Sequence, residues 1–212
     1  MNKTEYEFHI ATEKVRMEKG YLTRSEREKI KHMIENPKLY VVDEPKKLEV
    51  KKIITDLSIL NIPCEEITKE DNLTQIITDL RNTLEVFAHR AIGLSANQIG
   101  YNKRVSVLRI PTKIDQKTKK IDYNEIVLIN AKITNKMDKI KFENEGCLSF
   151  PGVHVTTERY IHCSVQFLNE KLEQQTALFS DIESLAAQHE IGHQNGETMF
   201  DHKWSDINRR SN

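Results

Sequence analysis

The segment that most restricts the fold of this chain lies near its C-terminal end, where Gln188 to His193 reads QHEIGH. On a helix, residues four positions apart lie on one face, so His189 and His193 point in the same direction with Glu190 beside them. Two imidazoles and a carboxylate in this arrangement are typical of a metal site that activates water. The HExxH pattern therefore predicts two metal ligands and a general base.

The residues around this pattern indicate a capped, partly buried helix. Ser180 and Glu183 fit a capping box at its start, and Gly196 is placed to end the helix after Asn195. The alternative is a surface helix with two histidines. We disfavour it because unpartnered imidazoles in a core are costly unless they share a ligand such as a metal ion. The histidines continue an apolar stripe made of Ile182, Leu185 and Ala186.

A third metal ligand is expected elsewhere, because catalytic metal sites commonly use three protein ligands and leave one position for water. The segment EGCLS, from Glu145 to Ser149, offers Cys147. A free cysteine is more often a small apolar residue, an interpretation that suits Cys163, in phase with a strand's apolar face, and Cys64. The odd number of cysteines, 3, does not suggest a disulfide framework, so Cys147 is available as a thiolate.

The segment IGLSANQIG, from Ile92 to Gly100, combines small residues with one amide. Gly93 lets the backbone approach a ligand closely, and Gln98 can donate a hydrogen bond to an oxyanion that develops during hydrolysis. Alone, this segment is more simply interpreted as a glycine-containing connection between a helix and a strand.

In this order the three segments resemble the three signature motifs of peptide deformylases: a glycine-rich loop ending in glutamine, then EGCLS, then QHExxH. The resemblance covers residues 52–204, because LNIPCEEI at Leu60 to Ile67 also resembles the family's N-terminal strand. It implies an α+β fold that removes the formyl group from the N-terminal formyl-methionine of nascent polypeptides. It also implies one divalent metal ion, usually ferrous iron, for which zinc, nickel or cobalt often substitutes.

The resemblance implies roles for individual residues. The family's metal ligands correspond to Cys147, His189 and His193. Glu190 corresponds to the acid/base that takes a proton from water and delivers it to the leaving amine. Gln98 and the backbone N–H of Leu148 correspond to the oxyanion donors. The methionine pocket would be lined by Ile92, Leu185 and Ala186. Gly93 would offer its backbone to the substrate.

Three departures from the family pattern bear on the site. The residue before the second histidine is nearly always aspartate in the family and is Gly192 here; a glycine inside a helix costs about 1 kcal/mol relative to alanine. The aspartate typically pairs with an arginine that Arg159 resembles. Because an unpaired buried charge is costly, we expect either that Arg159 turns toward solvent or that another carboxylate replaces the missing one. Two smaller departures are Ala91, where the first motif often begins with glycine, and His154, where many members have an arginine near the substrate.

The remaining sequence predicts an α+β domain behind a helical extension. Residues 1–50 are rich in Lys and Glu with weak helical periodicity, and prolines at 37 and 45 separate them from a domain at residues 51–212. In that domain, apolar residues recur at helical spacing from Leu73 to Phe87, with Asp71 or Asn72 as N-cap.

Mostly antiparallel strands are expected to pack around the HExxH helix. They are predicted at Val105–Ile110, Ile126–Ile133 and around residues 161–167. The polar stretch of residues 111–123 between the first two is predicted to be a long exposed loop or a hairpin.

The charge balance restricts the partners. With 32 basic and 32 acidic residues, no overall field directs the chain to DNA or to a membrane surface. The N-terminus carries Glu5 and Glu7 and resembles no signal or transit peptide, so we expect a cytoplasmic protein that acts on formyl-methionyl nascent peptides. Contact of Trp204, Arg209 or Arg210 with the ribosome near the exit tunnel is a hypothesis; solvated surface is the simpler interpretation.

Three functions therefore remain open. The first is an active deformylase. The second is a deformylase-like protein with weakened catalysis that binds formyl-peptides or a partner without turnover, motivated by Gly192 and the extension. The third is an unrelated HExxH peptidase, which would need a third ligand downstream, where His202 is the only histidine.

Overall fold

The computed structural model describes residues 3–18, 20, 22–39, 49–114 and 121–205. Contacts divide the chain into two units, Met1–Leu48 and Glu49–Asn212. The boundary between residues 50 and 51 stays a prediction, and Arg209 and Arg210 lie outside the described residues. No helix among the described residues is both long and apolar enough to cross a membrane.

Unit 1 (Met1–Leu48) contains two helices with a small core of their own. They are α1 (Lys3–Glu18) and α2 (Arg24–Glu35), and a 3-10 turn follows at Pro37–Leu39. The Thr23 hydroxyl accepts a hydrogen bond from the Glu26 N–H at 3.3 Å, and the Glu26 carboxylate accepts one from the Thr23 N–H at 2.7 Å. This reciprocal cap fixes the start of α2. The buried apolar side chains are Leu22, Ile30 and Met33.

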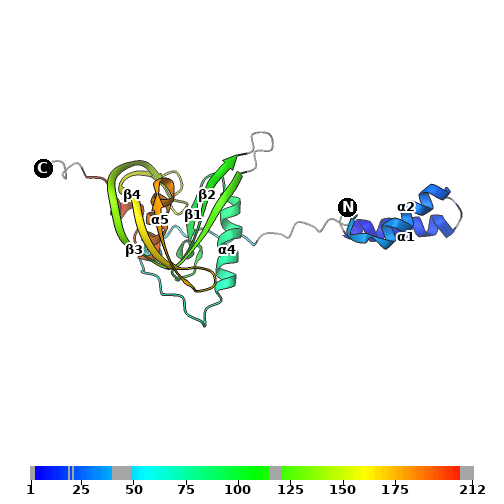
Figure 1. Cartoon of the computed structure of the whole chain (residues 1–212), viewed down its shortest axis with the longest axis horizontal. Helices are drawn as coiled ribbons and strands as arrows, with labels where there is room; N and C mark the ends of the chain where they lie inside the picture. The colour runs from blue at the N-terminus through cyan, green and yellow to red at the C-terminus, as the bar shows by residue number, and fades with distance from the viewer. Residues whose placement is uncertain (1–2, 19, 21, 40–48, 115–120, 206–212) are drawn as a thin grey trace. The chain divides into compact units, whose positions relative to one another are not determined.

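Unit 2 (Glu49–Asn212) is built on one antiparallel sheet with the strand order β1-β2-β3-β4-β5 (Figure 1). The strands are β1 (Gly93–Ser95), β2 (Val105–Ile114), β3 (Ile121–Gly146), β4 (His154–Leu168) and β5 (Gln174–Ser180). The helices are α3 (Leu57–Leu60), α4 (Leu73–Val86) and α5 (Asp181–Gln194), with 3-10 turns at Ala96–Ile99 and Met199–His202. The predicted α+β class is confirmed.

Helices α4 and α5 cover opposite faces of β2 and β3. Successive side chains of a strand point to opposite faces. Val105 and Val107 of β2 pack in one core cluster with residues of α4, whereas Leu108 and Ile110 pack in a second cluster with residues of α5. Because both faces are buried, these strands have nearly continuous apolar sequences, which is why they could be predicted.

Strand β3 is much longer than the predicted Ile126–Ile133: it spans 26 residues. Its pairing with β4 shifts register at three places, and Asn130, Asp138 and Asn144 have positive φ angles. Bulges of this kind bend and twist a strand. Figure 1 shows β3 and β4 curving around α5, so the sheet encloses the helix that carries the HExxH sequence.

The helix and hairpin ends give three confirmations and one correction. Asn72 is the N-cap of α4, and Gly196, with φ of 77°, follows the end of α5 as predicted. The predicted capping box at Ser180 is wrong, because this hydroxyl makes no cap hydrogen bond and lies 2.9 Å from His162 Nδ1. Of the two alternatives for residues 111–123, the hairpin is confirmed where the chain is described, because β2 runs to Ile114, β3 begins at Ile121 and the two strands pair antiparallel.

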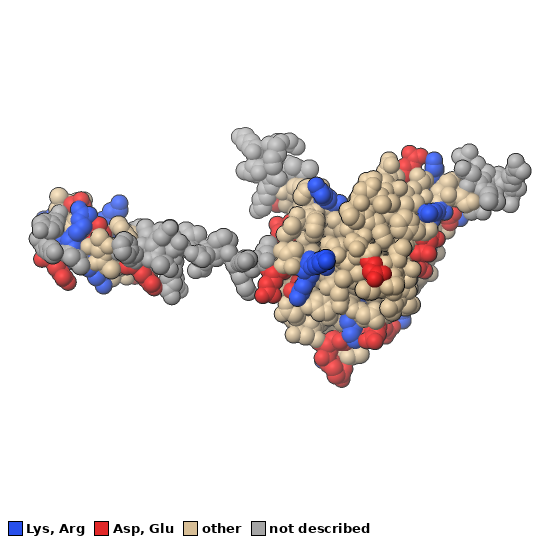
Figure 2. Space-filling model, turned by 180° about the vertical axis from the view of Figure 1, so that it is seen from behind, with Lys and Arg blue, Asp and Glu red and all other residues tan. Residues whose placement is uncertain are grey.

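The face of unit 2 drawn in Figure 2 shows little segregation of charge. On the face drawn in Figure 2, neutral side chains cover most of the area, and acidic and basic side chains are scattered among them. No field of one sign extends over this face, in keeping with the even charge tally of the sequence.

Candidate metal centre and active site

Helix α5 is fixed to its surroundings by buried hydrogen bonds. Gln188 Nε2 donates to the Tyr160 carbonyl of β4 at 2.7 Å, and its Oε1 accepts from the Tyr160 N–H at 3.1 Å. In the last turn, Asn97 Nδ2 donates to the His193 carbonyl at 2.9 Å, and Arg104 Nη1 donates to the next carbonyl at 3.0 Å. Carbonyls of a last turn have no partner within the helix. These contacts therefore hold both histidines of α5 on a rigid element.

The three predicted metal ligands come together between the end of β3 and α5. Cys147 Sγ lies 3.3 Å from His193 Nε2, and the ligand atoms of Cys147, His189 and His193 all lie within 4.8 Å of one another. Around a tetrahedral ion with bonds of about 2.0–2.3 Å, such atoms lie roughly 3.5 Å apart. The spacing therefore suits a single metal ion.

The chemistry of these side chains also fits a divalent metal. His193 is buried, and its Nδ1 has no hydrogen-bond partner among the described residues. Burial and the nearby His189 lower the pKa of His193 well below its usual value, so the ring is neutral. Neutral imidazoles and a thiolate are the forms that bind such ions. One sulfur and two nitrogens suit zinc or iron better than magnesium or calcium, which prefer oxygen.

Glu145 links the ligand His189 to Arg159. Its Oε1 accepts a hydrogen bond from His189 Nδ1 at 2.6 Å, and Arg159 donates two hydrogen bonds to the carboxylate at 2.8 and 2.5 Å. Burial alone would raise the pKa of Glu145, but the hydrogen bonds from Arg159 and His189 hold it well below its usual range. The carboxylate orients the imidazole so that Nε2 remains for a metal.

The same contact resolves the two alternatives for Arg159. The side chain is 3% exposed, so it does not turn toward solvent, and Glu145 is the replacing carboxylate. Sequence reasoning quoted Glu145 only as the first letter of EGCLS and gave it no role. The signal that could have found it was the missing aspartate at Gly192, which required a second acid near Arg159.

Two residues beyond α5 lie next to Gly192. A Cβ added there would lie 3.7 Å from Glu197 Oε2 and 3.9 Å from His202 Nε2, which are ordinary contact distances. Glu197 Oε2 and His202 Nε2 are 3.1 Å apart. His202 therefore contacts Glu197 and is not one of the three side chains grouped at the metal centre.

Glu190 lies beside the ligands in a confined position. A Cβ added at Gly93 would lie 2.6 Å from Glu190 Oε1, so only glycine leaves room for this carboxyl group. Glu190 Oε2 has no hydrogen-bond partner among the described residues. Burial raises the pKa of Glu190 to about 7. A carboxyl group with such a pKa is suited to accept and return a proton, and a neighbouring divalent ion would lower the pKa again.

Gln98 is held with its amide hydrogens toward the metal centre. Its Oε1 accepts a hydrogen bond from the Ser95 N–H at 2.9 Å, while Nε2 donates to Cys147 Sγ at 3.3 Å and to Ser149 Oγ at 3.1 Å. The Leu148 N–H donates no hydrogen bond to a described residue. Both groups can therefore donate to an oxygen atom placed near Cys147.

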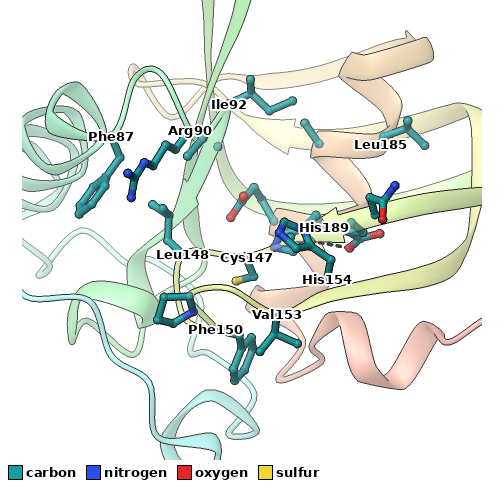
Figure 3. Close-up of a pocket in the computed structure, with 18 of the residues that line it drawn as sticks. Phe87, Arg90, Ile92, Cys147, Leu148, Phe150, Val153, His154, Leu185 and His189 are labelled. Atoms are coloured by element: carbon teal, nitrogen blue, oxygen red, sulfur yellow. Dashed lines mark hydrogen bonds and ion pairs between the residues drawn. The ribbon is translucent and has the colours of Figure 1, made fainter.

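A cavity of about 560 Å³ opens beside these groups (Figure 3). The predicted substrate residues Ile92, Gly93, Leu185 and Ala186 all line it. Ile182, predicted in a buried stripe, is instead 43% exposed at the cavity. Further apolar lining that the sequence did not reveal comes from Phe87, Phe142, Phe150 and Val153. Phe87 belongs to the periodic apolar pattern of α4 but was not predicted to line a pocket, and the other three lie in turns or near a strand end, where no periodic pattern marks them.

The chain matches the family model described as polypeptide deformylase over residues 50–210. It is 35% identical over 150 residues to the peptide deformylase of Aquifex aeolicus, which covers 70% of this chain and 84% of that protein. It is 36% identical over 140 residues to the peptide deformylase of Elusimicrobium minutum, which covers 66% of this chain and 77% of that protein.

Solved structures agree with these sequence matches. The peptide deformylase of Ehrlichia chaffeensis in complex with actinonin is similar with a TM-score of 0.63 and 29% identity, covering 76% of this chain and 92% of that one. The family match spans residues 50–210 and so contains the three metal-ligand candidates, Glu190, Gln98 and the lining of the cavity.

Proposed function

The chain belongs to the polypeptide deformylase family, and from this we propose that Cys147, His189 and His193 hold the metal ion of its reaction. Members of this family are metal-dependent hydrolases that remove the formyl group from the N-terminal formyl-methionine of polypeptides. One observation carries the assignment of the site to these residues. The sulfur of Cys147 lies 3.3 Å from both His193 Nε2 and Gln98 Nε2, at a cavity that Glu190 also lines.

The proposed reaction divides the work among a few groups. A divalent ion, when bound, polarises the formyl carbonyl and makes a water molecule more acidic. Glu190 accepts a proton from this water as the water oxygen bonds to the formyl carbon. Gln98 Nε2 and the Leu148 N–H donate hydrogen bonds to the carbonyl oxygen as it gains charge. Glu190 then gives the proton to the methionine nitrogen, the C–N bond breaks, and formate and a free amino group leave.

The substrate methionine is proposed to occupy the 560 Å³ cavity. Its apolar side chain would lie against Ile92, Leu185 and Ala186. Gly93 would offer its backbone to the peptide, because β1 is the edge strand of the sheet. The apolar lining supports a thioether side chain over a charged one.

The two competing functions are not favoured. Weakened catalysis was suggested by Gly192, but Glu145 supplies the carboxylate that Arg159 needs. A different kind of HExxH peptidase would need His202 as a ligand, and His202 Nε2 lies 3.1 Å from Glu197 instead.

Formate release tests the proposal directly. The full chain, loaded anaerobically with ferrous iron, should release formate from formyl-Met-Ala-Ser and leave an unformylated peptide intact. The metal-stripped protein serves as the control and should release none. Absence of formate from the loaded protein, beside a deformylase that is active under the same conditions, would refute the function.

Ferrous iron is proposed as the physiological metal because the family resemblance implies it. The thiolate and the imidazoles are compatible with this choice, since such ligands bind iron as well as zinc. Metal content after anaerobic purification, together with the activities of iron-, nickel-, cobalt- and zinc-loaded protein, tests this choice. A cytoplasmic location and work on nascent chains at the ribosome belong to the same proposal. Co-sedimentation of the full chain with translating ribosomes tests the second point.

A further inference from the structure

The charged side chains that line the cavity differ in how exposed they are to a bound substrate. Glu145 and Glu190 are each 4% exposed. Arg90, in contrast, is exposed at the mouth, and its guanidinium has no hydrogen bond or ion pair with any described residue. Figure 3 shows Arg90 near Phe87 and Ile92, on one side of the pocket and apart from Cys147 and His189. The accessible charge beside the cavity is therefore positive.

The path of a bound peptide follows from the position of the reacting end. The carboxyl of Glu190 lies against Gly93, so a formyl group next to Glu190 is also next to β1. Along the chain from there, residues 94–99 are buried, whereas residues 90–93 are partly or fully exposed and line the cavity. A peptide that extends along the free edge of β1 can therefore continue only toward Arg90.

The reach of the arginine selects the peptide positions involved. Arg90 lies in the turn that follows α4, three residues before Gly93, and it lines the same cavity as Gly93. A bound peptide that advances about 3.3 Å per residue from Gly93 would bring its second or third residue to the side of the cavity where Arg90 lies. The formyl group removes the positive charge of the peptide's N-terminus, so the substrate itself brings no cation near this guanidinium.

We propose that Arg90 is a specificity-determining residue that favours formyl-methionyl peptides with Asp or Glu at the second or third position. This inference rests on the proposed deformylase function. A carboxylate placed here pairs with a guanidinium that has no other described partner, whereas a lysine meets a like charge. Exposed ion pairs of this kind correspond to a rate difference of about two- to fivefold.

Rates on matched peptides test the inference. The values of kcat/KM are measured at low ionic strength for formyl-Met-Ala-Ser, formyl-Met-Glu-Ser, formyl-Met-Ala-Glu and formyl-Met-Lys-Ser, all amidated at the C-terminus to remove the terminal carboxylate. The native chain should prefer an acidic peptide over the alanine peptide about two- to fivefold. The preference should shrink as salt is added, because exposed charges are screened.

Two substitutions of Arg90 and one control give the decisive comparison. Arg90→Gln should lose the acidic preference, and Arg90→Glu should reverse it in favour of the lysine peptide. Lys171→Gln removes an exposed cation outside the cavity and should keep the native preference. Equal rates for acidic and alanine peptides in the native chain, or an unchanged preference in Arg90→Gln, would overturn the inference. Turnover of the alanine peptide separates this failure from a failure of the deformylase function itself.

Discussion

Two carboxyl groups of the site are buried equally but behave in opposite ways. Arg159 and His189 hold the pKa of Glu145 well below its usual range, whereas burial raises the pKa of Glu190 to about 7. The difference comes from partners, because Glu190 Oε2 has none among the described residues. A carboxylate that stays ionised suits the orientation of a ligand, and one near neutrality suits proton transfer. The two residues should therefore respond differently to the same substitution.

Glu145→Gln should destabilise the fold and weaken metal binding. The substitution leaves Arg159 buried without its charge partner, which costs about 3–5 kcal/mol. It also removes the acceptor for His189 Nδ1, and loss of such a partner typically costs about 10–100-fold in metal affinity. Chemical unfolding of the metal-free protein and metal titration measure the two effects separately.

Glu143→Gln is the matched control on the same strand. Glu143 is exposed and pairs with Lys141 at 2.9 Å, so its change should stay within about 0.5 kcal/mol. Equal behaviour of the two variants would contradict the role assigned to Glu145.

Glu190→Gln should abolish most of the activity without loss of metal. The amide has nearly the same shape but cannot carry the proton, and general acid–base groups contribute about 10²–10⁴-fold to rates. Because an amide has no charge to bury, the metal-free variant should be at least as stable as the native chain. Metal content, thermal unfolding and formate release are measured on one preparation. Activity near the native level would exclude Glu190 as the proton carrier.

Among the secondary-structure elements, α5 has the strongest sequence signal, and it also contains a glycine that lowers the stability of the helix. Its central Gly192 costs about 1 kcal/mol relative to alanine, and a Cβ there meets only atoms at 3.7 Å or beyond. Gly192→Ala should therefore stabilise unit 2 by about 0.5–1 kcal/mol and raise its Tm by roughly 2–4 °C per kcal/mol. Gly93→Ala is the contrasting variant and should lower the Tm, because its Cβ would lie 2.6 Å from Glu190 Oε1. A lower Tm for Gly192→Ala would mean that the neighbouring side chains pack closely against Gly192 and leave no room for a Cβ.

The elements that could be predicted from the sequence are those whose pattern is local. Helix α4 has a periodic apolar face and the N-cap Asn72, and buried strands such as β2 have continuous apolar sequences. Strand β5 was missed because its side chains are mostly polar and Leu178 is 60% exposed. The length of β3 was missed because most residues from Lys132 to Asn144 are exposed on a bent strand. The length of an exposed strand depends on the neighbouring strands with which it pairs, and its own sequence pattern does not reveal it.

The same distinction holds for the site. The ligands on α5 follow from local spacing, but Cys147 joins them only through long-range packing, which the family motifs indicated and spacing alone did not. Glu145 and the aromatic lining of the cavity, including Phe87 and Phe142, join the site only because elements far apart in the sequence come together. No sequence pattern pointed to a role for Arg90, because a single exposed arginine after a helix is common on protein surfaces.

At the scale of the whole molecule, unit 1 and unit 2 differ in what they contribute. The ligands, the proton carrier and the cavity lining all belong to residues 87–193. Unit 2 also holds both large apolar clusters, one under α4 and one under α5, while unit 1 has the small core around Ile30 and Met33. Each unit thus has an apolar core of its own, as expected of separable domains.

Removal of residues 1–48 should therefore leave the chemistry intact. The remaining chain keeps the whole sheet and the family match at residues 50–210. We expect residues 49–212 to fold cooperatively, bind one divalent ion and release formate from formyl-Met-Ala-Ser with the native kcat/KM. Circular dichroism, metal content and formate release on the full and shortened chains test this. If the shortened chain folds and binds metal but turns over more slowly, unit 1 takes part in substrate binding, and the function assigned to unit 2 alone is incomplete.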